Sequence, residues 1–241
     1  MTDALLWGLV VGSASLIGAL VGYYARMSHR TIGIVLGFGS GALISALAYD
    51  LIEQSFKQGG FVPVSVGFIG GACFFLSLSY LVSRIGGGAR KCPKGDCAEA
   101  GTGVLIGTIL DNIPETMVIG ASLLVGGKVS VVLLSAIFIS NLPEGLAGAS
   151  CLRNSGHSAR YTLGVWSAVF LVTGLSSVLG FVLFSGLPAS GIAAALAVAA
   201  GAIMAMLADT MMPEAYHDAG PMVALATVSG FLSAFIIGRI G

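Results

Sequence analysis

Eight apolar segments make up most of this chain, and each approaches or exceeds the roughly 20 residues that a helix needs to cross a lipid bilayer. Apolar side chains run through these segments without the period-two alternation that marks the strands of a membrane barrel. The sequence therefore predicts an all-α membrane protein whose single domain covers residues 1–241. The predicted spans are 4–25, 31–54, 62–84, 101–126, 129–151, 160–185, 190–213 and 221–240.

The composition is consistent with a surface that faces lipid. Only 9% of the residues are charged, against about 25% in soluble domains, and 56% are hydrophobic. The lipid bilayer is therefore the expected partner for most of the surface. The formal net charge is zero, so the sequence gives no basic surface for binding a nucleic acid.

Lysine and arginine are distributed unevenly over the predicted loops. If the N-terminus lies outside, the inner loops carry eight of these residues and the outer side carries three. The positive-inside rule then predicts that both termini lie outside and that the polar loop 85–100 lies in the cytosol. The short connections are typical of a protein of a prokaryotic inner membrane.

Two related motifs place acids deep inside the apolar spans. The stretch "DNIPET" (111–116) lies in the fourth span, and "SNLPEG" (140–145) lies 29 positions later, in the fifth. An ionisable side chain at such a depth costs at least about 2.5–3.5 kcal/mol on insertion scales, so it needs a partner or a function. No lysine or arginine lies in the central part of any span. Protons or a bound cation are therefore expected to neutralise these acids.

The spacing within the motifs predicts a cation site between two helices. Asp111 and Glu115 are four residues apart on one helix face, and Asn112 is three residues before Glu115. Asn141 and Glu144 repeat the three-residue spacing on the next span. The proline in each motif kinks its helix and frees the carbonyl four residues earlier. Carboxylate, amide and carbonyl oxygens together form a shell that divalent cations accept.

A fainter repeat relates "GALISALAYD" (41–50) in the second span to "GAIMAMLADT" (201–210) in the seventh. Both repeats pair spans that run in opposite directions. Inverted repeats with interrupted helices near the middle of the membrane are typical of transporters. Coupled protonation of the clustered acids further predicts that uptake depends on pH.

These motifs together resemble those of a known family. "DNIPET" followed by "SNLPEGLAGA" resembles the paired fourth- and fifth-helix motifs of the ZIP (Zrt-/Irt-like protein) divalent metal transporters. "ALAYDLIEQSF" and "ADTMMPEAYHDAG" are similar to the second- and seventh-helix motifs of that family, and the resemblance covers essentially the whole chain. It implies uptake of a divalent cation such as zinc, manganese, iron or cadmium toward the cytosol. It implies two adjacent metal positions, one formed by Asp111, Glu115, Ser140 and Glu144, the other by Asn112, Glu115, Asn141 and Glu144.

The chain departs from the family pattern at the implied site. Many members have histidine where this chain has Asp111, and many have histidine or an acid where it has Ser140 and Asn141. The sixth span, 160–185, lacks the acid that some members carry there. Without imidazole or thiolate ligands, the preference is expected to shift from Zn²⁺ toward harder ions such as Mn²⁺ or Fe²⁺. Carboxylates also bind zinc, so transport of Zn²⁺ is still expected.

Acids near the ends of two spans are candidates for the entrance and exit of a cation path. Asp50 and Glu53 lie at the outer end of the second span, where they would attract cations. Asp209 and Glu214 lie toward the inner end of the seventh span, where they would pass cations inward. The alternative is that these acids simply lie at helix ends that water covers. This interpretation fits Asp209 least well, because Asp209 lies deeper in its span.

Two of the four cysteines, Cys92 and Cys97, lie in the loop motif "CPKGDC", where they would bind or sense metal. A single pair with this spacing is a weak zinc motif, because structural zinc sites use a second pair. The other two cysteines lie inside apolar segments, so a disulfide framework is not expected.

Two other functions fit parts of the sequence. A transport-dead metal sensor would bind metal at the same acids without any flux. An intramembrane aspartyl protease would use Asp50 and Asp209, but the glycines expected beside its second aspartate are missing, and the paired motifs would have no role. The chain is therefore predicted to be no enzyme and to need no cofactor, and a homodimer is left open.

Overall fold

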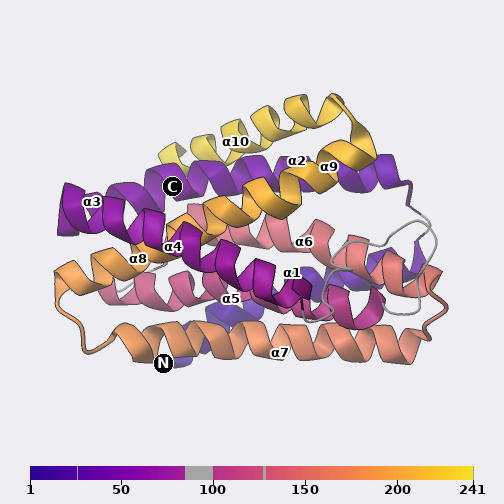
Figure 1. The fold of residues 1–241 in the computed structure, drawn as a ribbon, viewed down its shortest axis with the longest axis horizontal. Coiled ribbons are helices and arrows are strands. Elements are labelled where there is room, and N and C mark those ends of the chain that lie inside the picture. The colour runs from indigo at the N-terminus through magenta and orange to yellow at the C-terminus, as the bar shows by residue number, and fades with distance from the viewer. Residues whose placement is uncertain (26, 85–99, 127–128, 241) are drawn as a thin grey trace.

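The computed structural model describes residues 1–25, 27–84, 100–126 and 129–240, and these residues contain no strand. In this part of the chain, eight helices are long and apolar enough to span a membrane. Figure 1 shows the long helices lying side by side. The predicted all-α, eight-span fold is therefore confirmed. The elements are α1 (Thr2–Tyr24), α2 (His29–Ala46), η1 (Leu47–Ile52), α3 (Glu53–Gly59), α4 (Phe61–Val82), α5 (Ala100–Gly126), α6 (Val131–Asn154), α7 (Ala159–Phe184), α8 (Ala189–Met206), η3 (Leu207–Met211), α9 (Met212–Ala219) and α10 (Met222–Ile240).

The helices of the second and seventh spans extend beyond the predicted bounds, because each continues through a π-helical turn into a short helix. The turn η1 joins α2 to α3, and the turn η3 joins α8 to α9. Each short helix ends at a glycine with positive φ, Gly60 at 72° and Gly220 at 64°. The two glycines are 160 positions apart, and so are the starts of the two π-helical turns. This recurrence supports the predicted repeat between the second and seventh spans.

Glycines bring several helix pairs into backbone contact. A methyl group on Gly41 of α2 would lie 1.9 Å from the carbonyl oxygen of Thr227 in α10. Gly201 of α8 occupies the equivalent position of the repeat. A methyl group there would lie 1.9 Å from the carbonyl oxygen of Phe68 in α4. The pairs α1–α6 and α5–α7 approach through glycines in the same way. Small residues at such crossings are how helices associate tightly in a membrane.

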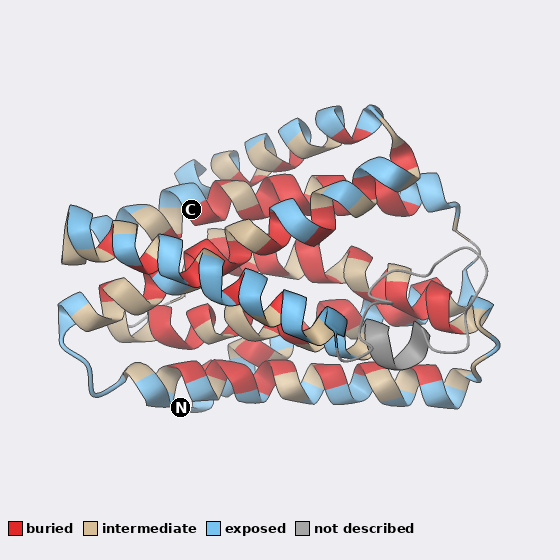
Figure 2. Ribbon diagram, viewed as in Figure 1, coloured by how far each residue is buried: buried red, intermediate tan, exposed pale blue. Residues whose placement is uncertain are grey.

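The acid motifs lie on helices that are surrounded mainly by other helices. The helix α2 packs on α6, α9 and α10, while α5 packs on α6, α7 and α8. Figure 2 shows buried segments along α2, α5, α6 and α8, and many exposed residues along α4, α7 and α10. The exposed residues include large apolar side chains such as Phe74 on α4 and Leu225 on α10, which suit contact with lipid. The protein is accordingly an integral, multi-pass membrane protein.

Candidate metal site

The two acid motifs lie within α5 and α6, which contact each other and remain helical through Pro114 and Pro143. Glu115 and Asn141 are fully buried, and Asn112 is 1% exposed. Polar side chains thus occupy positions that an apolar residue would fill if packing were their only role.

A hydrogen bond between side chains joins the two motifs. Asn112 Nδ2 on α5 donates to Glu144 Oε2 on α6 over a long 3.4 Å, and it donates to the Thr108 carbonyl at 2.9 Å. Thr116, one turn later, donates to the Asn112 carbonyl at 2.8 Å. The amide of Asn112 therefore spans the boundary between α5 and α6, at the place where the sequence predicts a shared site.

Several polar atoms of the two motifs are buried without a hydrogen-bond partner in the part of the chain that the structure describes. They are Asn112 Oδ1, both carboxylate oxygens of Glu115, and both the Oδ1 and the Nδ2 of Asn141. Leaving such groups unsatisfied costs about 1–3 kcal/mol each, and more when the group is charged. The oxygens among them are the ligand type that Mg²⁺, Mn²⁺ and Ca²⁺ accept, and the carboxylates also suit Zn²⁺. The residues present therefore fit a divalent cation as cargo.

Charge interactions extend this cluster beyond the two motifs. Glu144 interacts electrostatically with Glu115 and Asp111, and Asp111 also interacts with Glu115. Glu214, on α9, interacts with Glu144 as well. The sequence places Glu214 at the inner end of the path as a separate station, whereas the structure brings it within electrostatic range of Glu144.

The acids do not close into a complete cage. Within the described ranges, no group of three or more His, Cys, Asp or Glu side chains is arranged to hold a metal ion. Coordination between α5 and α6 therefore needs the amide oxygens of Asn112 and Asn141, or a movement of the side chains, in addition to the carboxylates.

Ser140, which the family resemblance implies as a ligand, uses its hydroxyl within its own helix. Its Oγ is buried and donates to the Ile137 carbonyl at 2.9 Å. Here α2 also approaches α6 closely, since a methyl group on Gly39 would lie 3.0 Å from Ser140 Cα and 3.3 Å from the Ile139 carbonyl oxygen. That carbonyl is the one that Pro143 leaves without its helical donor.

The acids near the span ends have other partners. Ser130 Oγ donates to Asp50 Oδ2 at 2.7 Å, and Lys57 lies 2.6 Å from the exposed Glu53 carboxylate. Ser79 Oγ donates to Asp209 Oδ2 at 3.2 Å. Sequence reasoning overlooked both serines, although a serine directly before an apolar run, such as Ser130, is a helix-start signal.

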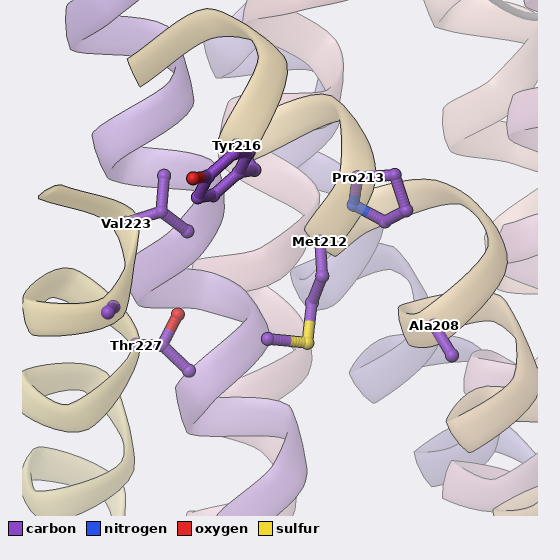
Figure 3. A pocket seen from close by; sticks show the side chains of 7 residues that line it. Ala208, Met212, Pro213, Tyr216, Val223 and Thr227 are labelled. Atoms are coloured by element: carbon purple, nitrogen blue, oxygen red, sulfur yellow. The ribbon is translucent and has the colours of Figure 1, made fainter. Parts of the chain in front are cut away.

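An apolar groove of about 430 Å³ lies between the η3–α9 region and α10. Figure 3 shows Met212, Pro213 and Tyr216 on one side and Val223 and Thr227 on the other. None of the predicted site residues lines it. The groove is therefore separate from the candidate metal site.

The predicted metal sensor at Cys92 and Cys97 lies outside the described residues. Among the described cysteines, Cys73 is free and exposed, whereas Cys151 is disulfide-bonded. The sequence predicts no disulfide framework, and Cys151 nonetheless takes part in one disulfide bond.

The fold and the central polar residues together define a class: multi-pass helical membrane proteins with buried acids and amides inside the bundle. Two proteins of Arabidopsis thaliana are similar to this chain. The zinc transporter ZTP29 is 30% identical over 95% of this chain and 90% of its own length. The protein named "Putative zinc transporter At3g08650" is 26% identical over 93% of this chain, which spans only 36% of that relative. The chain belongs to the ZIP family of metal transporters. No family model matches the chain.

Proposed function

We propose that this protein carries divalent metal cations, of the zinc, manganese, iron or cadmium type, across its membrane toward the cytosol. The observation that supports this most directly is the set of buried oxygens on α5 and α6 that have no hydrogen-bond partner among the described residues. A bound cation stabilises such oxygens, which would otherwise carry the cost of losing water. The names of both similar proteins support a metal as the cargo.

In this proposal, the cation exchanges part of its water for oxygens between α5 and α6. The residues that hold it are Asp111, Asn112, Glu115, Asn141 and Glu144. Asn112 orients the Glu144 carboxylate by donating to it, while its own Oδ1 stays available for the cation. Glu214 and Asp209 then receive the cation on its way inward, as one half of the bundle moves against the other.

The ligand set favours harder cations than a histidine-rich site does. Every proposed contact is a carboxylate or amide oxygen, and such oxygens reduce the advantage that Zn²⁺ has over Mn²⁺ and Fe²⁺ at an imidazole site. We therefore expect Mn²⁺ and Fe²⁺ to compete effectively with Zn²⁺ for entry.

The direct test is uptake by vesicles that contain the purified protein. We expect saturable entry of Zn²⁺, Mn²⁺, Fe²⁺ and Cd²⁺, with each ion competing against the others because they share one site. Vesicles with the Glu144→Gln variant are expected to show uptake near the level of protein-free vesicles. Wild-type vesicles that bind these metals tightly without any flux would instead support a transport-dead sensor.

The orientation can be tested in cells. The distribution of lysine and arginine over the loops supports a protein with both termini outside. A tag with a protease site at either terminus is therefore expected to be cleaved by protease added to intact cells. Protection of both tags until the cells are lysed would reverse the proposed orientation, and with it the assignment of Asp50 to the outer end.

A further inference from the structure

Asp50 lies in the π-helical turn η1 and joins two helices. Ser130 Oγ donates to Asp50 Oδ2 at 2.7 Å. Ser130 is the N-cap of α6, where its Oγ accepts from the Leu133 N–H at 3.4 Å. The carboxylate is thus bound to the N-cap of the helix that carries Asn141 and Glu144.

A second contact between the same two helices lies ten residues further along α6. If Gly39 carried a methyl group, that group would lie only 3.0 Å from Ser140 Cα. The backbones of α2 and α6 are therefore in close contact here. Eleven positions separate Gly39 from Asp50, whereas ten separate Ser130 from Ser140. The longer stretch, from Gly39 to Asp50, ends in the π-helical turn η1. Each hydrogen bond of a π-helix encloses one more residue than that of an α-helix, and this accounts for the extra residue. The two contacts therefore fix α6 against α2 at both ends of this stretch.

We infer that Asp50 is a positioning residue, which sets the height of α6 in the bundle and thereby the place of its metal ligands. The consequence for metal binding rests on the proposed function. With a rise of 1.5 Å per residue, Asn141 lies about 16 Å and Glu144 about 21 Å along the helix from Ser130. A helix transmits a shift of its first turn along its axis, and a misplacement of about 1 Å is enough to cost a site much of its activity.

This role differs from the one that the sequence suggested. An acid that attracts cations at an entrance acts through its charge, and the hydroxyl of Ser130 would be irrelevant to it. An acid that positions α6 acts through its oxygen acceptors, so the charge is secondary and the hydroxyl is essential. The neighbouring Glu53 is paired with Lys57 on its own helix, so it serves as a charged comparison.

The test is a set of variants at positions 50 and 130, with Mn²⁺ alone as the probe of the purified full-length protein. Calorimetry is expected to show that Asp50→Ala and Ser130→Ala each weaken Mn²⁺ binding about fivefold. The double variant is expected to be no weaker than either single one, because both remove the same link. Asp50→Asn and Ser130→Thr keep the acceptor and the donor, so they are expected to bind Mn²⁺ within about twofold of the wild type.

A matched control separates this link from ordinary helix capping. Ser158 caps α7 by accepting from Tyr161 N–H, as Ser130 caps α6, but its recorded bond involves no carboxylate. Ser158→Ala is therefore expected to bind Mn²⁺ like the wild type. The inference would be overturned if the losses of Mn²⁺ affinity at positions 50 and 130 added in the double variant. It would also be overturned if Ser130→Ala bound Mn²⁺ as tightly as the wild type.

The outcome is also distinguishable from a failure of the proposed function. If the wild type binds no Mn²⁺ and carries none, the proposed function fails. The same double-variant cycle, measured by thermal unfolding of the metal-free protein, then decides on the link by itself. If the losses of thermal stability in the two single variants do not add in the double variant, the link between Asp50 and Ser130 is supported. If they add, the link is contradicted.

Discussion

Replacing Glu115 by glutamine is expected to lower metal uptake by about 100-fold while the protein stays folded. Glu115 is fully buried, and neither of its carboxylate oxygens has a hydrogen-bond partner within the described residues. Changes to groups that only orient a metal ligand typically cost 10- to 100-fold, so the loss of a charged ligand should reach at least the upper end of that range. A factor of 100 corresponds to about 2.8 kcal/mol of binding free energy.

The empty protein should tolerate this change well. Glutamine has nearly the same shape as glutamate, and it removes a buried charge that interacts with Asp111 and Glu144. Removing a buried charge that has no cationic partner relieves a desolvation cost, so thermal stability without metal is expected to stay the same or to rise. The measurements are uptake by reconstituted vesicles and thermal unfolding in detergent.

Glu53→Gln is the matched control for this experiment. It makes the same chemical change on an exposed side chain whose partner is Lys57, and a surface ion pair of this kind contributes little to stability. Uptake by this variant is expected to remain within about twofold of the wild type. Normal uptake by Glu115→Gln would remove Glu115 from the metal site.

Replacing Gly71 by alanine is expected to destabilise the folded protein by about 3 kcal/mol, at the upper end of the cost of overpacking. A methyl group on Gly71 of α4 would lie 1.8 Å from the carbonyl oxygen of Val198 in α8. The obstacle is backbone, so it cannot rotate away, and the two helices must separate. A loss of this size should lower the thermal unfolding midpoint by roughly 10 °C in a chain of this length.

The adjacent Gly70 provides a control one residue away on the same helix. A methyl group there would meet no atom within 4 Å. Gly70→Ala is therefore expected to leave the unfolding midpoint unchanged or to raise it slightly, since alanine favours the helix by up to about 1 kcal/mol. Equal midpoints for the Gly70 and Gly71 variants would show that α4 and α8 are further apart than the structure places them.

The sequence predicted the fold well because the relevant pattern is local. A run of about 20 apolar residues identifies a span without reference to the rest of the chain, and all eight predicted spans correspond to helices. The helices of the second and seventh spans continue past the predicted bounds, through π-helical turns. A π-helical turn has no composition of its own, so the run of apolar residues gave no sign of it.

The candidate site was predictable in part for the same reason. Buried acids such as Glu115 are conspicuous in an apolar helix, and the repeat of asparagine and glutamate at the same spacing linked two spans. The sequence did not indicate that Asp50 would bond to Ser130, because the two residues are 80 positions apart. Nor did it place Glu214 within range of Glu144.

The sequence by itself determined the class of protein, the number of spans and the polar residues that lie within them, because the cost of placing charge in lipid acts on each segment separately. Only the tertiary structure decided which of those residues meet. Close crossings at glycines such as Gly41 and Gly201 set how the helices lie against one another. That packing brings the Asn112 amide to Glu144 and the Asp50 carboxylate to the start of α6, and no local pattern encodes either contact.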